Sequence, residues 1–304
     1  MALKEVITSI GAVILVLLLF FYWVFPLETI DFGTTKSRNS NFSLGNYGNA
    51  SMQFYENMRY PEKDISYRIQ GCPISKSDEM KNSFEIIENL TILNFYSVAD
   101  NEEISVTCDS KAKFEGNLFI AGEGGPINIT NAGDFNVIRR GAISLIRESK
   151  CENPNVGIHE LLHALGFDHS ENPNNIMYNI SKCSQTIGQD IPDTINQLYS
   201  FPSLPDLAFE NVSATMEGRY LNVNFTIRNQ GLKDSSGAAI KIYADGEIIK
   251  EIKTEPLDIG SGRRIWITNL FVFQKSINEL EFFINTNFEE LDRENNRVVL
   301  EYKN

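Results

Sequence analysis

One long apolar run stands out from the many short patterned segments of this chain. Residues 6–25 are twenty consecutive residues without a charged side chain. A helix of that length rises 1.5 Å per residue and spans the roughly 30 Å hydrocarbon core of a membrane. The run ends in the bulky residues Tyr22–Phe25, whereas a cleaved signal peptide ends in small ones. The pattern therefore predicts one uncleaved transmembrane helix at residues 6–25.

The residues that flank this run predict its orientation. Lys4 precedes it within a short end, residues 1–5, while Glu28 and Asp31 follow it. The positive-inside rule then predicts a cytoplasmic N-terminus, a single pass through the cell membrane and an extracytoplasmic bulk. Residues 26–57 are rich in Gly, Ser, Asn and Thr, which predicts a poorly ordered stalk.

The next segment, residues 58–202, has the pattern of an α+β domain. Residues 65–69 alternate like a strand, and residues 77–92 place Met80, Phe84 and Ile87 on one helical face, with Ser77 as the N-cap. A last helical pattern ends at Leu198–Tyr199. Short apolar segments predict further strands at residues 93–98, 104–107, 118–121, 127–129 and 137–146.

Residues 205–304 have the pattern of an all-β domain. Pro202 and Pro205 mark its boundary, and residues 221–227 alternate between apolar and polar side chains. Asp245-Gly246 predicts a hairpin turn. With further strands at residues 264–273, 279–284 and 297–302, about seven short strands predict an immunoglobulin-like β-sandwich.

The composition indicates in which compartment the protein folds and which classes of partner it can bind. The 304 residues carry 27 Lys+Arg against 40 Asp+Glu, a net charge of −13, which disfavours nucleic acid as a partner. An even number of cysteines suits two disulfides in an oxidising, extracellular compartment. We favour pairing Cys151 with Cys183, and Cys72 with Cys108, although four cysteines allow three pairings.

Three histidines carry the clearest chemistry. The chain has only three, and all lie in residues 159–169, His-Glu-Leu-Leu-His-Ala-Leu-Gly-Phe-Asp-His. On a helix, His159 and His163 are four apart and project from one face, so both reach a single zinc ion. Gly166 adopts the left-handed conformation that ends a helix, and the returning chain brings His169 up as the third ligand. Three protein ligands leave a fourth position for water, as in catalytic zinc sites.

Glu160 is the candidate general base beside this site. It follows the first histidine and projects about 100° around the helix from it, toward a water rather than toward the metal. A zinc-activated water with Glu160 as base hydrolyses peptide bonds. The segment Glu123–Pro126 either lines a substrate cleft beside an edge strand or is only a turn.

The histidine segment is the long zinc motif of the metzincin metallopeptidases, and Asn175–Tyr178 resembles their Met-turn. Ser170 and the run from His169 to Tyr178 resemble the matrixin family in particular. The resemblance implies an α+β domain with a mainly parallel mixed sheet and a zinc helix, endopeptidase activity, and an apolar floor under the zinc formed by Met177. Matrixins usually bind a second, structural zinc through further histidines. This chain has none left, so one catalytic Zn²⁺ is expected.

The last hundred residues resemble a second family. Pro205–Leu207, Asn229–Gly231, Asp245-Gly246 and Leu291–Asn296 look like the corresponding parts of the cell-adhesion-related CARDB domain. The resemblance implies a binding or spacer module with a cell-surface partner. Acidic residues at 289–294 raise the question of calcium, but a charged loop is the simpler interpretation.

Two hypotheses therefore remain. The first is a membrane-anchored, extracytoplasmic zinc endopeptidase that acts on proteins or peptides. The second is a non-hydrolytic adhesion or scaffold protein built on a metzincin domain. Glu160 and the open zinc position favour the first.

Overall fold

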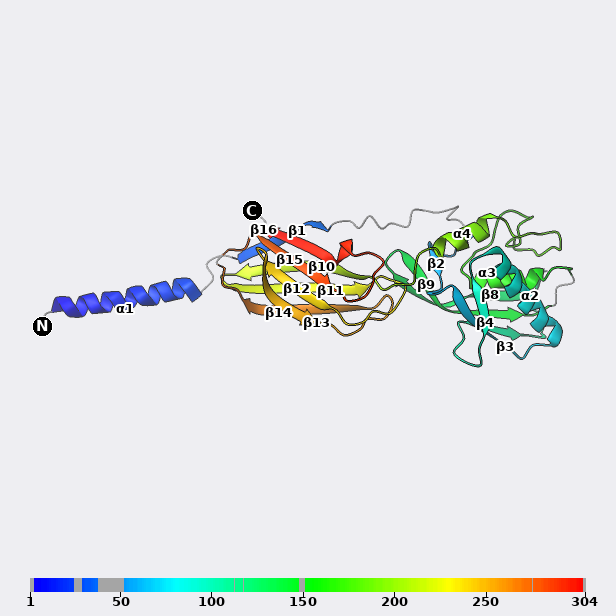
Figure 1. The fold of residues 1–304 in the computed structure, drawn as a ribbon, viewed down its shortest axis with the longest axis horizontal. Helices are drawn as coiled ribbons and strands as arrows, with labels where there is room; N and C mark the ends of the chain where they lie inside the picture. The colour runs from blue at the N-terminus through cyan, green and yellow to red at the C-terminus, as the bar shows by residue number, and fades with distance from the viewer. Residues whose placement is uncertain are drawn as a thin grey trace.

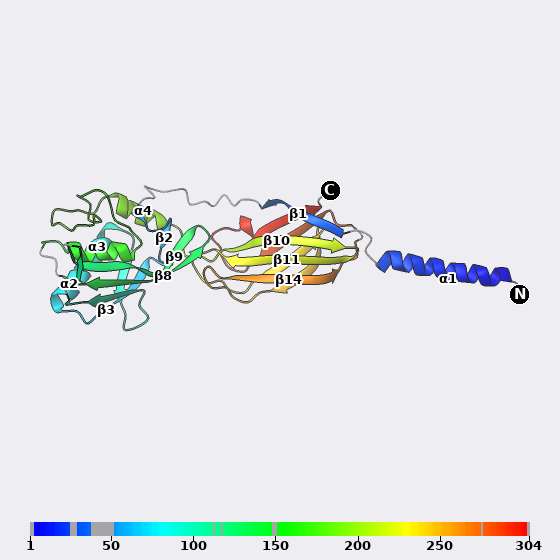
Figure 2. The ribbon, with the colours of Figure 1, turned by 180° about the vertical axis from the view of Figure 1, so that it is seen from behind.

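The computed structural model describes residues 3–24, 29–37, 52–111, 113–116, 118–147, 151–274 and 276–302. Apart from the N-terminal helix, the described chain forms two domains (Figures 1 and 2). We call residues 52–202 the mixed domain. The second domain, the sandwich, consists of residues 29–37 and 205–302.

A six-stranded sheet supports the mixed domain. Five strands are parallel to their neighbours, in the order β2 (Met58–Arg59), β9 (Phe135–Leu145), β5 (Ile104–Cys108), β3 (Asp64–Gln70) and β4 (Asn94–Ser97). The sixth, β8 (Gly122–Ala132), pairs antiparallel with β9 alone and is therefore an edge strand. A small hairpin joins β6 (Lys113–Glu115) to β7 (Leu118–Ile120). The sheet is thus mixed and mainly parallel, as expected.

Three helices complete this domain: α2 (Ile74–Leu90), α3 (Asn155–Ala164) and α4 (Asp190–Leu198). In α2 the predicted face of Met80, Phe84 and Ile87 is buried. The predicted start at Ser77 is wrong, because Pro73 is the N-cap and its carbonyl accepts a hydrogen bond from the Ser77 N–H. The helix therefore begins three residues earlier, at Ile74.

The sandwich contains the seven strands expected after residue 205. They are β10 (Leu207–Glu217), β11 (Tyr220–Asn229), β12 (Ala239–Ala244), β13 (Glu247–Lys253), β14 (Gly262–Phe271), β15 (Glu279–Asn285) and β16 (Arg297–Tyr302). A short 3₁₀ helix, η2 (Glu294–Asn296), precedes β16. The strands follow the order β13-β12-β15-β16-β1-β10-β11-β14, where β1 spans Thr29–Ser37. The ring of Phe225 on β11 lies 5.7 Å from that of Phe282 on β15, so the two halves of this order face each other across one core.

An eighth strand corrects the predicted stalk. Residues 26–57 were expected to be a spacer, but β1 (Thr29–Ser37) lies between β16 and β10 and is antiparallel to both. Phe32 is only 6% exposed and packs in the sandwich core. Burial of this alternating segment outweighs its loop-like composition. Residues 26–28 and 38–51 of the predicted stalk lie outside the described residues.

The N-terminal helix, α1, runs from Leu3 to Val24. Among the helices in the described part of the chain, none has the length and apolar character required to cross a membrane. The anchor predicted at residues 6–25 is therefore not supported by this finding. Residues 1 and 2 of the predicted cytoplasmic end lie outside the described residues.

The two domains meet where the β8–β9 turn contacts one end of the sandwich (Figure 1). A buried apolar cluster joins Phe135 of β9 to Leu232 and Ile259, with Phe201 and Leu291 packed against it. Nearby, the Arg59 guanidinium donates hydrogen bonds to the carbonyls of Leu198 and Phe201. The segment between α4 and the sandwich, which we call the linker, is therefore held by contacts with both domains.

Candidate metal centre

The zinc helix predicted from the sequence is α3, which is buried along its whole length. It contacts α2 on one side and the edge strand β8 on another. The side chains of Ile158, Leu161, Leu162 and Leu165 form the expected apolar stripe and lie in the core. This stripe anchors the helix, so the positions of its histidines are set by packing.

Gly166 ends the helix as predicted, with a φ of +99°. The N–H of Gly166 donates to the carbonyl of His163, and the N–H of Phe167 donates to the carbonyl of Leu162. A Cβ atom at Gly166 would lie 2.8 Å from the Cβ of Met58. Both the backbone angle and this close approach require glycine, and the turn returns the chain toward His169.

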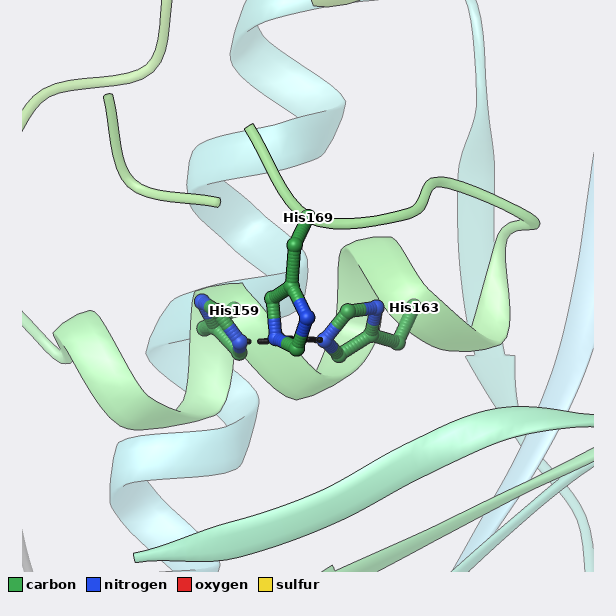
Figure 3. Close-up of side chains that lie close together, drawn as sticks. All are labelled: His159, His163 and His169. Carbon is green, nitrogen blue, oxygen red and sulfur yellow. Dashed lines mark hydrogen bonds between the residues drawn. The ribbon is translucent and has the colours of Figure 1, made fainter. Parts of the chain in front are cut away.

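The three histidine side chains converge on one point (Figure 3). The Nε2 atom of His163 lies 3.0 Å from Nε2 of His159 and 3.2 Å from Nε2 of His169. One ligand atom from each ring lies within 4.8 Å of the others. His159 and His163 are buried while His169 is exposed, so the centre borders solvent on the His169 side.

Backbone carbonyls determine which ring nitrogens face this point. Nδ1 of His159 lies 2.7 Å from the carbonyl oxygen of Ile176, and Nδ1 of His163 lies 2.7 Å from that of Phe167. A carbonyl only accepts, so each Nδ1 carries the proton and each Nε2 presents a lone pair. Lone pairs about 3 Å apart repel one another unless a cation lies between them. The donor set therefore fits Zn²⁺, which favours imidazole nitrogen.

Electrostatics keep the buried histidines unprotonated. Burial, followed by repulsion from His159, lowers the pKa of His163 to about 4. Burial also lowers the pKa of His159. A metal ion binds neutral imidazole, so these rings need not lose a proton to bind it near neutral pH.

The side chain of Glu160, on α3, packs against the edge strand β8. Burial raises the pKa of its carboxyl group to about 8, and the nearby charge of Glu123 adds to the rise. A Cβ at Gly122 would lie 2.6 Å from the Glu160 side chain, and one at Gly124 would overlap the Glu160 backbone. The segment 123–126, which the sequence left open between a cleft wall and a turn, is thus part of a strand that faces the candidate base.

The predicted Met-turn supports two of the histidines through its backbone. The Ile176 carbonyl contacts His159, as described above. The carbonyl of Met177 accepts a hydrogen bond of 2.8 Å from the N–H of Ser170, which follows His169. The Met177 side chain is fully buried in the core of the mixed domain. Its role as a floor beneath a metal ion stays a prediction.

Both favoured disulfides are present, between Cys72 and Cys108 and between Cys151 and Cys183. The second connects the approach to α3 with the segment after the Met-turn. Asn155, the first residue of α3, adds a hydrogen bond of 2.8 Å to the Lys182 carbonyl. The entry and exit of the histidine segment are therefore tied together.

Sequence reasoning missed Phe54, which had been placed in the stalk. Its ring stacks on His163 with 5.7 Å between ring centres. The Phe54 N–H also donates to the carbonyl of Gly166 at 3.0 Å. The aromatic pair Phe54-Tyr55 within a polar stretch was the one local signal for this contact.

The comparisons with known proteins agree with these two domains. Residues 59–200 match the family model described as matrixin, and residues 204–299 match the CARDB family model. The chain joins a matrixin-like domain to a CARDB-like domain. The matrixin match includes the three histidines, Glu160 and the Met-turn segment.

The comparisons with curated proteins and with solved structures add less information than the two family models. None of the curated proteins compared matches this chain. One matching solved structure is the CARDB domain of a Pyrococcus furiosus protein, described as being in complex with di-metal ions. It is 15% identical, the match covers 33% of this chain and 86% of that one, and the TM-score is 0.28.

Proposed function

We propose that the matrixin-like domain is a zinc-dependent endopeptidase. The observation that carries the proposal is the convergence of three Nε2 atoms on one point, with Glu160 buried on the same helix, directly after His159. His159, His163 and His169 would hold the ion. The matrixin match over residues 59–200 supports the same reaction class.

Bound zinc supplies a Lewis acid that polarises a peptide carbonyl and lowers the pKa of water. Glu160 accepts the proton of the attacking water and delivers it to the nitrogen of the leaving amine, so the carboxylate is regenerated. Among the described strands β8 pairs with β9 alone, and one of its faces packs against Glu160, so its other edge would align an extended peptide by backbone hydrogen bonds. The substrate is thus a protein or peptide in extended conformation.

The test is cleavage of a mixed peptide library by the zinc-loaded, full-length protein and by Glu160→Gln. The variant should lose about 10²- to 10⁴-fold in rate, because a general base contributes that much. Glu171→Gln is the matched control, since Glu171 is an exposed acid two residues after His169 and should leave the rate unchanged.

Zinc content, measured by mass spectrometry, should be one ion at this centre in all three proteins. A zinc-loaded wild type that cleaves nothing in the library would favour the alternative function, a non-hydrolytic surface scaffold. Equal rates in the wild type and Glu160→Gln would instead exclude Glu160 as the base.

We further propose that the enzyme acts outside the cell, on an anchor formed by α1. The uncharged run at residues 6–25 and the exposed apolar side chains of Ile7–Phe21 support this location, although no described helix is long and apolar enough to cross a membrane. Carbonate extraction of membranes should leave the full chain in the pellet and release a chain that begins at Thr29. Release of both would refute the anchor. A cell-surface partner of the CARDB-like domain stays a prediction.

A further inference from the structure

A cluster of acidic side chains lies buried at the junction of the two domains. We call it the junction cluster; its carboxylates are Asp206, Glu290 and Asp292, and its amides are Asn295 and Asn296. The three acids are 4%, 8% and 9% exposed. The sequence had favoured a charged loop at residues 289–294, but two of the acids in this segment, Glu290 and Asp292, are buried.

Among the described residues, no positive charge balances the negative charge of this cluster. In the described part of the chain, no lysine or arginine forms an ion pair with Asp206, Glu290 or Asp292. Asp134, in the β8–β9 turn of the other domain, adds another negative charge near Asp206. Burial of several carboxylates without a balancing positive charge costs free energy, even where they accept hydrogen bonds from neutral groups.

The same cluster contains oxygen atoms that lack a donor. Oδ2 of Asp292 and the Oδ1 atoms of Asn295 and Asn296 are buried and accept no hydrogen bond. The amide orientations are set by the acids, because the Asn295 Nδ2 donates to Asp206 at 2.9 Å and the Asn296 Nδ2 donates to Glu290 at 2.7 Å. Asn296 is only 3% exposed. Each amide therefore turns its nitrogen to a carboxylate, and its oxygen is buried without a hydrogen-bond donor.

We propose that the junction cluster binds a hard divalent cation, Ca²⁺, through side-chain oxygens of Asp206, Asp292, Asn295 and Asn296. Calcium binds carboxylate and amide oxygens, with waters completing its six to eight ligands. One such ion satisfies the unpaired acceptors and the uncompensated charge together. The all-oxygen set differs from the nitrogen set of the histidine centre, so the two sites select different metals.

The position of this site suggests what the ion does. Leu291 packs in the apolar cluster that joins the domains, and the Leu291 N–H donates to the Pro205 carbonyl of the linker. Asp206 follows that proline and leads directly into β10. A cation that holds Asp206 to the 292–296 segment therefore stiffens the junction, and the inference does not depend on peptidase activity.

The test is calorimetric titration of CaCl₂ into the full-length, zinc-loaded protein in mild detergent, together with thermal unfolding with and without calcium. The wild type should bind saturably, with an affinity of about 10⁻⁴–10⁻³ M or tighter, as extracellular calcium modules do. Its unfolding midpoint should rise with calcium. Asp292→Asn should weaken binding at least tenfold, and Glu289→Gln, which removes an exposed charge from the same loop, should not.

The Asp292→Asn variant keeps the Oδ1 acceptor for the Glu294 N–H, so the loop can retain its fold. In calcium-free buffer its unfolding midpoint should be equal to or above that of the wild type, because one repelling charge is gone. Asp206→Asn should reproduce both results. No saturable binding by the wild type at about 10 mM calcium, or an equal loss of affinity in Glu289→Gln, would overturn the proposal.

Discussion

At the scale of single residues, two backbone carbonyls prepare the histidine centre before any metal arrives. Ile176 and Phe167 each accept the Nδ1 proton of a buried histidine, and this directs the Nε2 lone pairs inward. The His-Glu-x-x-His spacing predicts the two helical ligands but says nothing about the carbonyls. Those come from the Met-turn and from the turn after Gly166, so their role depends on tertiary structure.

Gly166 is a residue whose replacement should be costly. Gly166→Ala places a Cβ against Met58 at a φ of +99°, so we expect a loss of about 1–3 kcal/mol in the free energy of unfolding and a displaced His169. Urea unfolding and zinc affinity measure the two effects. Gly71→Ala is the matched control, since Gly71 also has positive φ but has nothing within 4 Å. Equal losses in both variants would mean that the contact with Met58 does not matter.

Glu102 offers a pH-dependent test at the same scale. Its hydrogen bond to Arg68, 2.7 Å long, lowers the pKa of the carboxyl group below 4.5. The bond therefore stabilises the fold above the unfolded pKa, and this contribution is lost as pH falls through the folded one. We expect Glu102→Gln to cost about 1–3 kcal/mol at pH 7 and progressively less in acid.

Hydrogen exchange of the amides of β3 and β5 measures this change near the mutated side chain. Asp78→Asn, which breaks the exposed pair with Lys81, should have almost no effect at either pH. A loss from Glu102→Gln that stays constant between pH 7 and pH 3 would show that the charge is not its cause.

At the scale of elements, the sequence predicted the helices and strands that depend on local periodicity. It did not predict the elements that depend on contacts with distant parts of the chain. The helix of Met80, Phe84 and Ile87 and the strand at residues 65–69 follow from periodicity, which is a local property. The full length of β8 did not follow, because Gly122, Gly124 and Gly125 have low strand propensity. They are strand residues because β8 pairs with β9 and passes directly against α3.

The close passage of β8 along α3 predicts a selective effect on catalysis. Gly124→Ala would force a Cβ into the backbone of Glu160, so we expect at least about a tenfold loss of peptide cleavage as the base moves. Zinc content should fall less than the cleavage rate, because the Ile176 and Phe167 carbonyls still orient His159 and His163. Gly125→Ala is the neighbouring control, with no atom within 4 Å of the added carbon. Similar activity in both variants would contradict the proposed alignment.

At the scale of the whole molecule, the matrixin-like domain lies between β1 and the rest of the sandwich in the chain. The sequence predicted a stalk at residues 26–57 because the composition there is that of a spacer. The partners of β1, which are β10 and β16, come from the far end of the chain, and no local pattern pairs them. The junction cluster likewise joins Asp206 to residues 290–296, which only the fold brings together.

This arrangement predicts that the sandwich depends on residues that precede the other domain. A chain that begins at Met52 lacks β1, loses the buried Phe32 side chain and exposes the edges of β10 and β16. Calorimetry should show the sandwich transition lowered by roughly 10 °C or more relative to a chain that begins at Thr29, because removal of a buried Phe side chain alone costs about 3–5 kcal/mol. The transition of the matrixin-like domain serves as the internal control and should move little, since its core contains no residue of β1. Identical sandwich transitions in the two chains would refute the strand assignment and restore the stalk.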